Sequence, residues 1–357
     1  MPRLRVGVLY GGRSGEHEVS IASAASIFKH LDPSKYEAVP IRIEKSGQWT
    51  LGAKVPTAIS AADVRSQAPG EALQRVEPSA VVAATGLDVV FPVLHGPYGE
   101  DGSVQGLLEL ANIPYVGAGV LGSAVGMDKA VMKTLFAAHF LQITPHFVVL
   151  RPEWTRDPRV VTEQVSGDVD YPVFVKPANL GSSVGISKAT SDAEFAAAME
   201  LALQFDRKIV VEAAVPQARE IECAVLGNDD PEASVAGEIV PAGEFYDYKA
   251  KYLDDSSRLL IPAPLDEDQA TEIRRLAVEA FRAVEGAGMA RVDFLVSGES
   301  GEIYVNEVNT IPGFTTISMY PKLWEASGLS YSALLDRLIN LALERHAEKQ
   351  QLRTSLT

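Results

Sequence analysis

Cysteine is almost absent from this chain, because Cys223 is the only one among its 357 residues. One thiol excludes internal disulfide bonds and any metal site made of cysteines alone. Apolar runs of about 20 residues, the length that crosses a bilayer, are also missing from the sequence. The N-terminus enters the strand-like stretch Leu4–Tyr10 directly and lacks the layout of a signal peptide. We therefore expect a cytoplasmic protein that does not bind a membrane.

Positive charge is scarce relative to negative charge. The chain has 32 lysines and arginines against 47 aspartates and glutamates, so its net charge is −15. This excess of acid argues against non-specific binding of nucleic acid or anionic lipid. Hydrophobic residues make up 46% of the chain and charged residues 22%, which is typical of a globular protein. A chain of this length exceeds one ordinary core, so two or three domains are expected.

Three units can be distinguished along the chain. Residues 1–122 alternate strands with helices, which predicts an α/β domain with a parallel sheet. A central domain is expected at 123–217 and a C-terminal domain at 218–357, with a polar loop at about 243–257. The expected strands are 4–10, 87–94, 114–117, 144–150, 171–177, 208–212 and 220–226. The expected helices begin at about 18 or span 103–111, 124–140, 192–204, 266–287 and 330–346. Pro92 predicts a bulge or an early end in its strand.

Charged residues interrupt an apolar pattern between Arg291 and Gly313, where we expect a β-hairpin. Side chains alternate along a strand, so every second residue shares a face. The residues expected on one face are Arg291, Asp293 and Leu295 of the first strand and Val305, Glu307 and Asn309 of the second. If Val296 pairs with Glu302, Arg291 lies opposite Glu307.

Two carboxylates on one strand face need a partner of opposite charge. Neighbours across a strand pair lie ~4.5–5.5 Å apart at Cβ, where two like charges repel by roughly 3–4 kcal/mol at an effective dielectric of about 20. Oxygen ligands such as those of Asp293, Glu307 and Asn309 suit Mg²⁺. The sequence therefore predicts a magnesium site, and the simpler alternative is the solvated face of an edge hairpin.

Other stretches have the composition of phosphate and substrate sites. Lys176 ends an apolar strand and precedes the loop Gly181–Gly185, which supplies backbone N–H groups for phosphate; the alternative is a lysine that extends into solvent. Glu16 near a helix start either holds an ammonium group or interacts with the helix dipole. Tyrosines at 244–252 indicate a lid or an ordinary surface loop. Thr315–Met319 either binds a carboxylate or caps a helix.

Together these motifs resemble the D-alanine–D-alanine ligases of the ATP-grasp superfamily, over nearly the whole chain and in the same order. The motifs are Gly-Gly-x-Ser-x-Glu-His-Glu-Val-Ser (11–20), His-Gly-x-x-Gly-Glu-Asp-Gly (95–102), Met-Asp-Lys (127–129), Lys-Pro (176–177) with Gly-Ser-Ser-Val-Gly (181–185), Phe-Tyr-Asp-Tyr-Lys-Ala-Lys-Tyr (245–252), Arg-Val-Asp-Phe (291–294) and Glu-Val-Asn-Thr-Ile-Pro-Gly-Phe-Thr (307–315). The resemblance implies a three-domain ATP-grasp architecture, α/β at the N-terminus and α+β in the ATP-grasp part.

The resemblance also implies a reaction. Such enzymes use ATP to phosphorylate the carboxylate of one D-alanine, and the amine of a second D-alanine attacks the acyl phosphate. The products are D-alanyl-D-alanine for peptidoglycan precursors, ADP and phosphate. Two Mg²⁺ ions, or Mn²⁺ in their place, are implied as cofactors, ATP as co-substrate, and a homodimer as the assembly.

Residue roles carry over from the matching motifs. The metal ligands would be Asp293, Glu307 and Asn309. The catalytic residues would be Glu16, Ser182, Tyr252, Arg291 and Gly313. The D-alanine-binding residues would be Glu16, His95, Arg291, Gly313, Ser318 and Met319. The ATP-binding residues would be Lys129, Phe174, Lys176, Ser182, Ser183, Glu212, Ala214, Val215, Glu220, Phe245, Lys251, Leu295, Asn306 and Glu307.

Two hydroxyl residues, Ser182 and Tyr252, need a separate interpretation. In the family they bond to each other and, with Glu16, tie the lid to the N-terminal domain. A hydroxyl with a pKa of about 10 is a poor base at neutral pH. We therefore assign both to positioning and lid closure, with proton relay as the alternative.

Other members of the superfamily are alternatives for the function. A D-alanine–D-lactate or D-alanine–D-serine ligase would share the ATP site, although ligases that make the lactate ester depart from the tyrosine-rich lid at 245–252 seen here. A non-catalytic ATP-grasp binding protein is expected to have lost metal or phosphate ligands. This chain retains Asp293, Glu307, Asn309, Lys129 and Lys176, which favours an enzyme.

Overall fold

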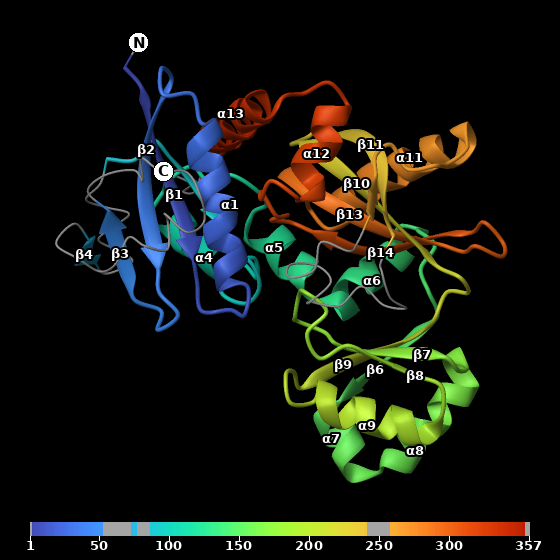
Figure 1. Ribbon diagram of the computed structural model, residues 1–357. Coiled ribbons are helices and arrows are strands. Elements are labelled where there is room, and N and C mark those ends of the chain that lie inside the picture. Colours follow the sequence, from blue (N-terminus) through green and yellow to red (C-terminus); the bar gives the residue numbers. More distant parts are fainter. Residues whose placement is uncertain (1, 53–72, 77–85, 241–257, 354–357) are drawn as a thin grey trace.

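The computed structural model describes residues 2–52, 73–76, 86–240 and 258–353. Figure 1 shows three β-sheets, each with its own helices: the first lies at the left of the view, the C-terminal sheet at the upper right and the central sheet at the bottom. The expected lid at about 243–257, with Phe245, Lys251 and Tyr252, lies outside the described residues. Within the described part, no helix is both long and apolar enough to cross a membrane.

The first sheet has the strand order β4-β3-β2-β1-β5. Strand β1 (Leu4–Gly11) pairs in parallel with β2 (Tyr36–Ile43) and with β5 (Val89–Val93), so the expected parallel sheet forms its centre. Strands β3 (Trp49–Gly52) and β4 (Leu73–Val76) extend it antiparallel. Its helices include α1 (His17–His30) and α4 (Ser103–Leu110).

Two expectations for this sheet were wrong. Strand β5 runs through Pro92 without ending early, because β5 is the last strand of the sheet and a missing N–H costs little there. The strand expected at 114–117 is reduced to one parallel bridge between Tyr115 and Val90.

The C-terminal sheet is antiparallel in the order β12-β11-β10-β13-β14. Its strands are β10 (Arg219–Gly227), β11 (Glu232–Val240), β12 (Arg258–Leu260), β13 (Gly288–Val296) and β14 (Ile303–Asn309). Its helices are α11 (Glu267–Ala283), α12 (Met319–Ala326) and α13 (Tyr331–Gln350). Both faces of β10 are buried, since Ile221 and Cys223 face α11 while Ala224 and Leu226 face α12 and α13.

The central sheet is antiparallel in the order β6-β9-β7-β8 and forms the lower part of Figure 1. Its strands are β6 (His146–Leu150), β7 (Val173–Pro177), β8 (Ser187–Ala189) and β9 (Lys208–Ala213). The helices α7 (Arg151–Arg156), α8 (Pro158–Gln164) and α9 (Asp192–Ala202), with the π-helical turn Val165–Val169, cover one face.

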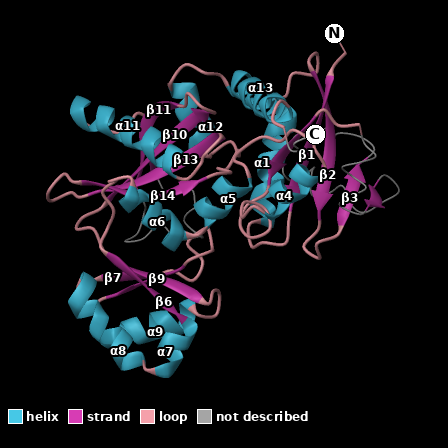
Figure 2. Ribbon diagram, turned by 180° about the vertical axis from the view of Figure 1, so that it is seen from behind, coloured by secondary structure: helices cyan, strands magenta, loops and turns pink. Residues whose placement is uncertain are grey.

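The helix expected at 124–140 is two helices, α5 (Val120–Met127) and α6 (Lys129–Ala138). Asp128 interrupts the helix. Its carboxylate accepts hydrogen bonds from the N–H groups of Ala130 at 3.1 Å and Val131 at 3.2 Å and so caps the start of α6. Figure 2 shows α6 beneath the C-terminal sheet, toward the central one. Met132 and Phe136 of α6 pack in the core of the C-terminal sheet.

An aromatic cluster joins the first sheet to the C-terminal helices. Phe314 is fully buried. Its ring centroid lies 5.7 Å from that of Phe91 in β5, 5.6 Å from that of Tyr320 in α12 and 6.1 Å from that of Tyr331 in α13. Because Phe314 follows Gly313, this cluster fixes the end of the hairpin segment against the first sheet.

We predict that F314A lowers the free energy of unfolding by about 3–5 kcal/mol, because it leaves a cavity where three aromatic rings meet. Urea denaturation followed by circular dichroism measures the change. I317A is the control, because Ile317 is 51% exposed nearby and should cost about 0.5 kcal/mol or less. Equal losses for both variants would contradict the proposed packing role.

Candidate active site

The two strands β13 and β14 meet in a register that differs from the expected one. Val296 pairs with Ile303 near the turn, whereas Asp293 pairs with Glu307 and Arg291 with Asn309. The register shifts by one residue between the pairs Phe294–Val305 and Asp293–Glu307, and this shift is a β-bulge at Asn306.

The bulge changes which residues share a face. Val305 lies opposite Phe294 in the core, so the prediction that it shares a face with Glu307 was wrong. The extra residue lets the consecutive side chains of Asn306 and Glu307 both line the same cavity. The bulge therefore keeps Asp293 and Glu307 on one face.

Three carboxylates form a row across three neighbouring strands. Asp293 of β13 pairs with Glu307 of β14 on one side and with Glu222 of β10 on the other. Each acid has a cation near it: Lys129 Nζ lies 3.2 Å from Glu307 Oε2, and Arg291 Nε lies 3.2 Å from Glu222 Oε2. The cations offset the repulsion that three adjacent carboxylates would otherwise experience.

Arg291 holds the centre of this row. Its Nε donates to Asp293 Oδ1 at 2.7 Å and its Nη2 to Asp293 Oδ2 at 2.6 Å, a two-point contact within one strand. Burial alone would lower the pKa of Arg291, but Asp293 and Glu222 outweigh it and raise the pKa well above the usual value. The guanidinium therefore remains charged.

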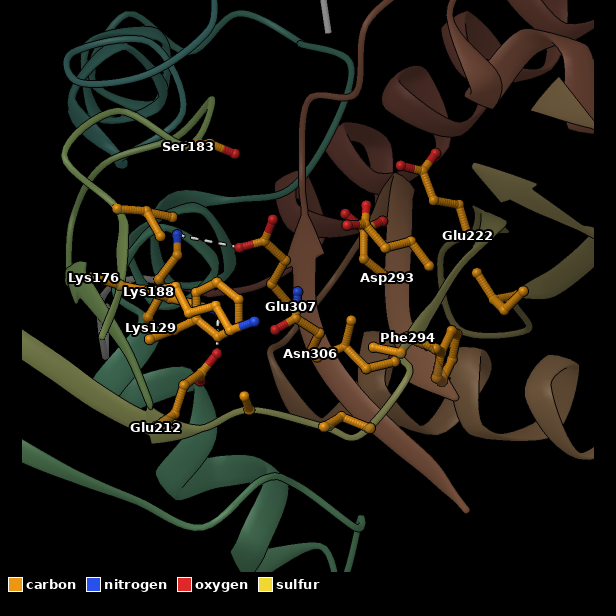
Figure 3. A pocket seen from close by; sticks show the side chains of 18 of the residues that line it. Lys129, Lys176, Ser183, Lys188, Glu212, Glu222, Asp293, Phe294, Asn306 and Glu307 are labelled. Atoms are coloured by element: carbon orange, nitrogen blue, oxygen red, sulfur yellow. Dashed lines mark hydrogen bonds and ion pairs between the residues drawn. The ribbon is translucent and has the colours of Figure 1, made fainter. Parts of the chain in front are cut away.

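A cavity of about 360 Å³ lies between the central and C-terminal sheets. Figure 3 shows Lys129, Lys176 and Lys188 on one side of it and Asp293, Phe294 and Asn306 on the other. The predicted ATP-binding residues that line it are Lys129, Phe174, Lys176, Ser183, Glu212, Ala214, Val215, Glu220, Leu295, Asn306 and Glu307. The cavity thus has lysines on one side and the polar side chains of β13 and β14 on the other, with Phe174 beside Lys176.

Glu212 lies at the inner wall of the cavity between two lysines. Its Oε1 accepts a hydrogen bond from Lys176, and its Oε2 lies 2.9 Å from Lys133 Nζ. Burial would raise the pKa of Glu212, but the two lysines outweigh burial and lower the pKa far below the usual range. Glu212 is therefore a carboxylate although it is buried.

Glu16 and Ser182 meet across two units. Ser182, in the loop between β7 and β8, donates a hydrogen bond to Glu16 Oε1 at the start of α1. The loop approaches closely, since a Cβ on Gly181 would lie 3.3 Å from Glu16 Oε2. Ser182 and Ser183 both have positive φ, at 53° and 57°. This contact is the part of the predicted lid network that lies within the described residues.

His95 lies beside Glu16 and is buried. Its Nδ1 is 3.1 Å from the carbonyl oxygen of Ile311, which can only accept, so Nδ1 carries the proton and Nε2 keeps its lone pair. Burial lowers the pKa of His95, against the opposing effect of Glu16. The imidazole is therefore neutral near pH 7.

Glu100 is a second buried acid close to Glu16, and the sequence had indicated it only as part of a motif. Its Oε1 accepts the Gly96 N–H at 2.8 Å, while Oε2 has no hydrogen-bond partner in the described part of the chain. Burial and the charge of Glu16 raise the pKa of Glu100 well above its usual value. Both acids lie next to Gly181.

Gly313 and Ser318 lie together at the start of α12. A Cβ on Gly313 would be 2.7 Å from Ser318 Oγ, so any larger residue there would force the Ser318 side chain to move. Ser318 Oγ accepts the Thr315 N–H at 3.0 Å, and Met319 begins the helix. The first N–H groups of α12 form a positive end that suits a carboxylate.

The residues expected to hold Mg²⁺ fit that ion. Asp293 and Glu307 are direct cross-strand neighbours, and both already face cations. Asn309 Oδ1 accepts the Ile311 N–H at 3.1 Å and retains a second lone pair. Among the described residues no three acidic, histidine or cysteine side chains form a closed metal cage. Mg²⁺ needs few protein oxygens when phosphate and water complete its shell.

Several residues of the cavity were missed from the sequence. Those that line it without having been predicted are Ile186, Lys188, Gln217, Ala218, Ile221, Glu222 and Phe294. Glu222 follows Glu220 by two residues, so strand alternation would have placed both on one face. Lys133 follows Lys129 by four residues, and helical spacing would have placed these two side by side. Phe245 and Lys251 lie outside the described residues, and Ser182 contacts Glu16 outside the cavity.

Comparisons with known proteins cover most of the chain. Family models described as the D-ala D-ala ligase N-terminus and C-terminus match residues 5–118 and 135–340. The curated D-alanine--D-alanine ligases of Heliobacterium modesticaldum and Solibacter usitatus are 51% and 52% identical, over 98% of each chain.

Solved structures give the same result. The D-alanine-D-alanine ligase from Coxiella burnetii is similar with a TM-score of 0.81 and 37% identity, over 98% of this chain and 97% of that one. The VanG D-Ala:D-Ser ligase from Enterococcus faecalis has a TM-score of 0.85 and 36% identity, over 96% and 100%.

We predict that S182A increases amide hydrogen exchange in residues 181–186 severalfold, because the contact with Glu16 restrains this loop. Exchange followed by mass spectrometry measures it without ligand. S187A is the matched control, because it removes a hydroxyl from adjacent β8 and leaves the Glu16 contact intact. Unchanged exchange in S182A would show that the loop is restrained by other contacts.

Proposed function

The chain belongs to the D-alanine–D-alanine ligase family, and we propose that it joins two D-alanine molecules into D-alanyl-D-alanine for peptidoglycan precursors, with ATP converted to ADP and phosphate. The fold is that of the ATP-grasp ligases. The observation that supports the reaction best is the cavity between two antiparallel sheets, where Lys129 and Lys176 face the neighbouring strands β13 and β14 that carry Asp293 and Glu307.

The cavity supports binding of ATP along its length. Lys129, Lys176 and Ser183 would contact phosphate oxygens, with Lys251 of the lid as a further contact. Adenine would lie near Phe174 and Leu295, and the resemblance adds Phe245 to these residues. Glu212 and the backbone of Ala214 and Val215 would contact its edge, Glu220 the ribose, and Asn306 the neighbouring phosphates. These lysines would stabilise the charge of the transferred phosphoryl group.

Asp293, Glu307 and Asn309 would hold Mg²⁺, with Mn²⁺ as an acceptable replacement. Held there, the metal would supply positive charge against the phosphate oxygens during transfer. In the absence of ligands, Arg291 and Lys129 balance the charge of the same carboxylates that would bind the metal.

The peptide-forming step needs groups that bind the first D-alanine, stabilise the oxyanion and bind the second D-alanine. Glu16, with neutral His95 beside it, would hold the ammonium group of the first D-alanine. Arg291 and the Gly313 N–H would stabilise the oxyanion that forms when the second amine attacks. Ser318 and the Met319 N–H would bind the carboxylate of the second D-alanine at the start of α12.

Ser182 and Tyr252 would position the lid and close it over the substrates. The contact from Ser182 to Glu16 supports this role for Ser182. We further propose that 1–122, 123–217 and 218–357 act as three domains, that two copies of the chain form a homodimer, and that the enzyme works in the cytoplasm, where its ATP is available.

We predict that the protein releases phosphate and ADP with ATP, Mg²⁺ and D-alanine, and that D-alanyl-D-alanine accumulates in equal amount. Coupled phosphate release and mass spectrometry of the product measure this. Phosphate release that remains at background would contradict the proposed function. One similar structure is a D-Ala:D-Ser ligase, so a D-alanine–D-serine or D-alanine–D-lactate ligase is the second candidate function. Competition of D-serine and D-lactate against D-alanine distinguishes the two candidates, and a mixed dipeptide or ester as the main product would favour the second.

We predict that E307Q lowers turnover about a hundredfold or more and raises the Mg²⁺ concentration needed for half-maximal rate, because an amide replaces a charged ligand. Steady-state rates over a Mg²⁺ titration measure both. E302Q is the control on the same hairpin, since Glu302 is exposed at its turn. Near-normal turnover of E307Q would contradict the metal assignment.

A further inference from the structure

Lys133 is a buried lysine that no part of the proposed reaction uses. Its side chain is 2% exposed, and its Nζ lies 2.9 Å from Glu212 Oε2. It also donates to Thr144 Oγ1 at 3.2 Å, and this hydroxyl donates to the same Glu212 oxygen at 3.4 Å. Lys133 does not line the cavity, whereas Glu212 and Lys176 do. The three charges therefore form a series, with Lys176 at the cavity, Glu212 behind it and Lys133 deepest.

Helix α6 directs two lysines toward two different sheets. Lys129 and Lys133 are one turn apart and so lie on the same face. Lys129 reaches Glu307 of β14 in the C-terminal sheet, and Lys133 reaches Glu212 of β9 in the central sheet. Glu212 thus has a fixed partner on the side away from the cavity.

The arrangement matters when a nucleotide enters. Glu212 is 1% exposed, so water does not replace a lost partner. An uncompensated buried carboxylate is strongly unfavourable. If Lys176 were the only cation at Glu212, it could move to a phosphate only by leaving that charge unpaired. With Lys133 in place, the carboxylate stays compensated while Lys176 moves.

We propose that Lys133 is a positioning residue of the nucleotide site, which keeps Glu212 compensated so that Lys176 can leave it for the nucleotide phosphates. The inference rests on the proposed binding of ATP in this cavity. Two features agree with it. The two lysines lower the pKa of Glu212, so the acid is charged and needs a partner. Burial lowers the pKa of Lys133, and the charge of Glu212 opposes this effect, so each charge supports the other.

The test measures binding of ADP with Mg²⁺ by isothermal titration calorimetry, without D-alanine. K133M removes the charge and preserves the length of the side chain, and we expect at least a tenfold loss of ADP affinity. T144V is the matched control: it removes the hydroxyl shared by Lys133 and Glu212 but keeps both charges, and should cost less than threefold. K133R retains the charge and should keep affinity within about threefold of wild type. In steady state, K133M should raise the KM for ATP more than it lowers kcat.

A double-mutant cycle separates positioning from general damage to the core. E212Q removes the carboxylate between Lys133 and Lys176, so adding K133M to E212Q should cost less than threefold in ADP affinity. This double variant also removes both members of the pair and is expected to fold if K133M alone does not.

The inference is overturned if folded K133M binds ADP within twofold of wild type, or if K133M costs tenfold in both backgrounds. Wild-type protein that binds no ADP would instead contradict the proposed function. Wild type that binds ADP and makes dipeptide, with K133M unchanged, would contradict only the role of Lys133.

Discussion

Compensation of charge in a buried cleft is the constraint on which the site depends. Glu222, Asp293 and Glu307 occupy one row of a sheet, and such neighbours repel by several kcal/mol unless cations separate them. Arg291 comes from β13 itself, two residues from Asp293, whereas Lys129 comes from α6. The charge of Glu212 is compensated in the same way, because Glu212 is buried between Lys133 and Lys176. A site balanced in this way can exchange one cation for another when ligands arrive, because no carboxylate is left unpaired.

Local periodicity predicted the acidic face of the hairpin, whereas the roles of the other site residues were implied by the resemblance to a known family. Strand alternation placed Asp293 with Arg291 and Leu295, and the structure has that face as expected. Alternation failed on β14, because a single inserted residue at Asn306 moves Val305 to the core and leaves Glu307 at the cavity. A bulge depends on the fit of two strands and has no clear signal in either one. The break at Asp128 is different, since an aspartate before Lys129 is a recognisable helix cap.

Long-range pairing explains what the sequence could not predict. Glu222 joins the acid row because β10 pairs with β13, and Lys133 contacts Glu212 because α6 lies near β9. Neither neighbour can be derived from local spacing. The motifs, in contrast, pointed to a single place: eleven of the residues that the resemblance implies for ATP binding line one cavity. The parallel core of the first sheet and the helices at 266–287 and 330–346 were predictable for the same reason, because their patterns are regular over many residues.

Several contacts of the site, within the described residues, join different units of the molecule. Ser182 of the central unit donates to Glu16 of the first, and Lys133 on α6, which packs on the C-terminal sheet, reaches Glu212 of the central one. Phe314 holds the C-terminal helices against β5. The geometry of the site is therefore set by how the units pack together, and no sheet contains it alone. Because such contacts bridge units, a ligand that takes over one partner of a pair changes the interaction between two units at once.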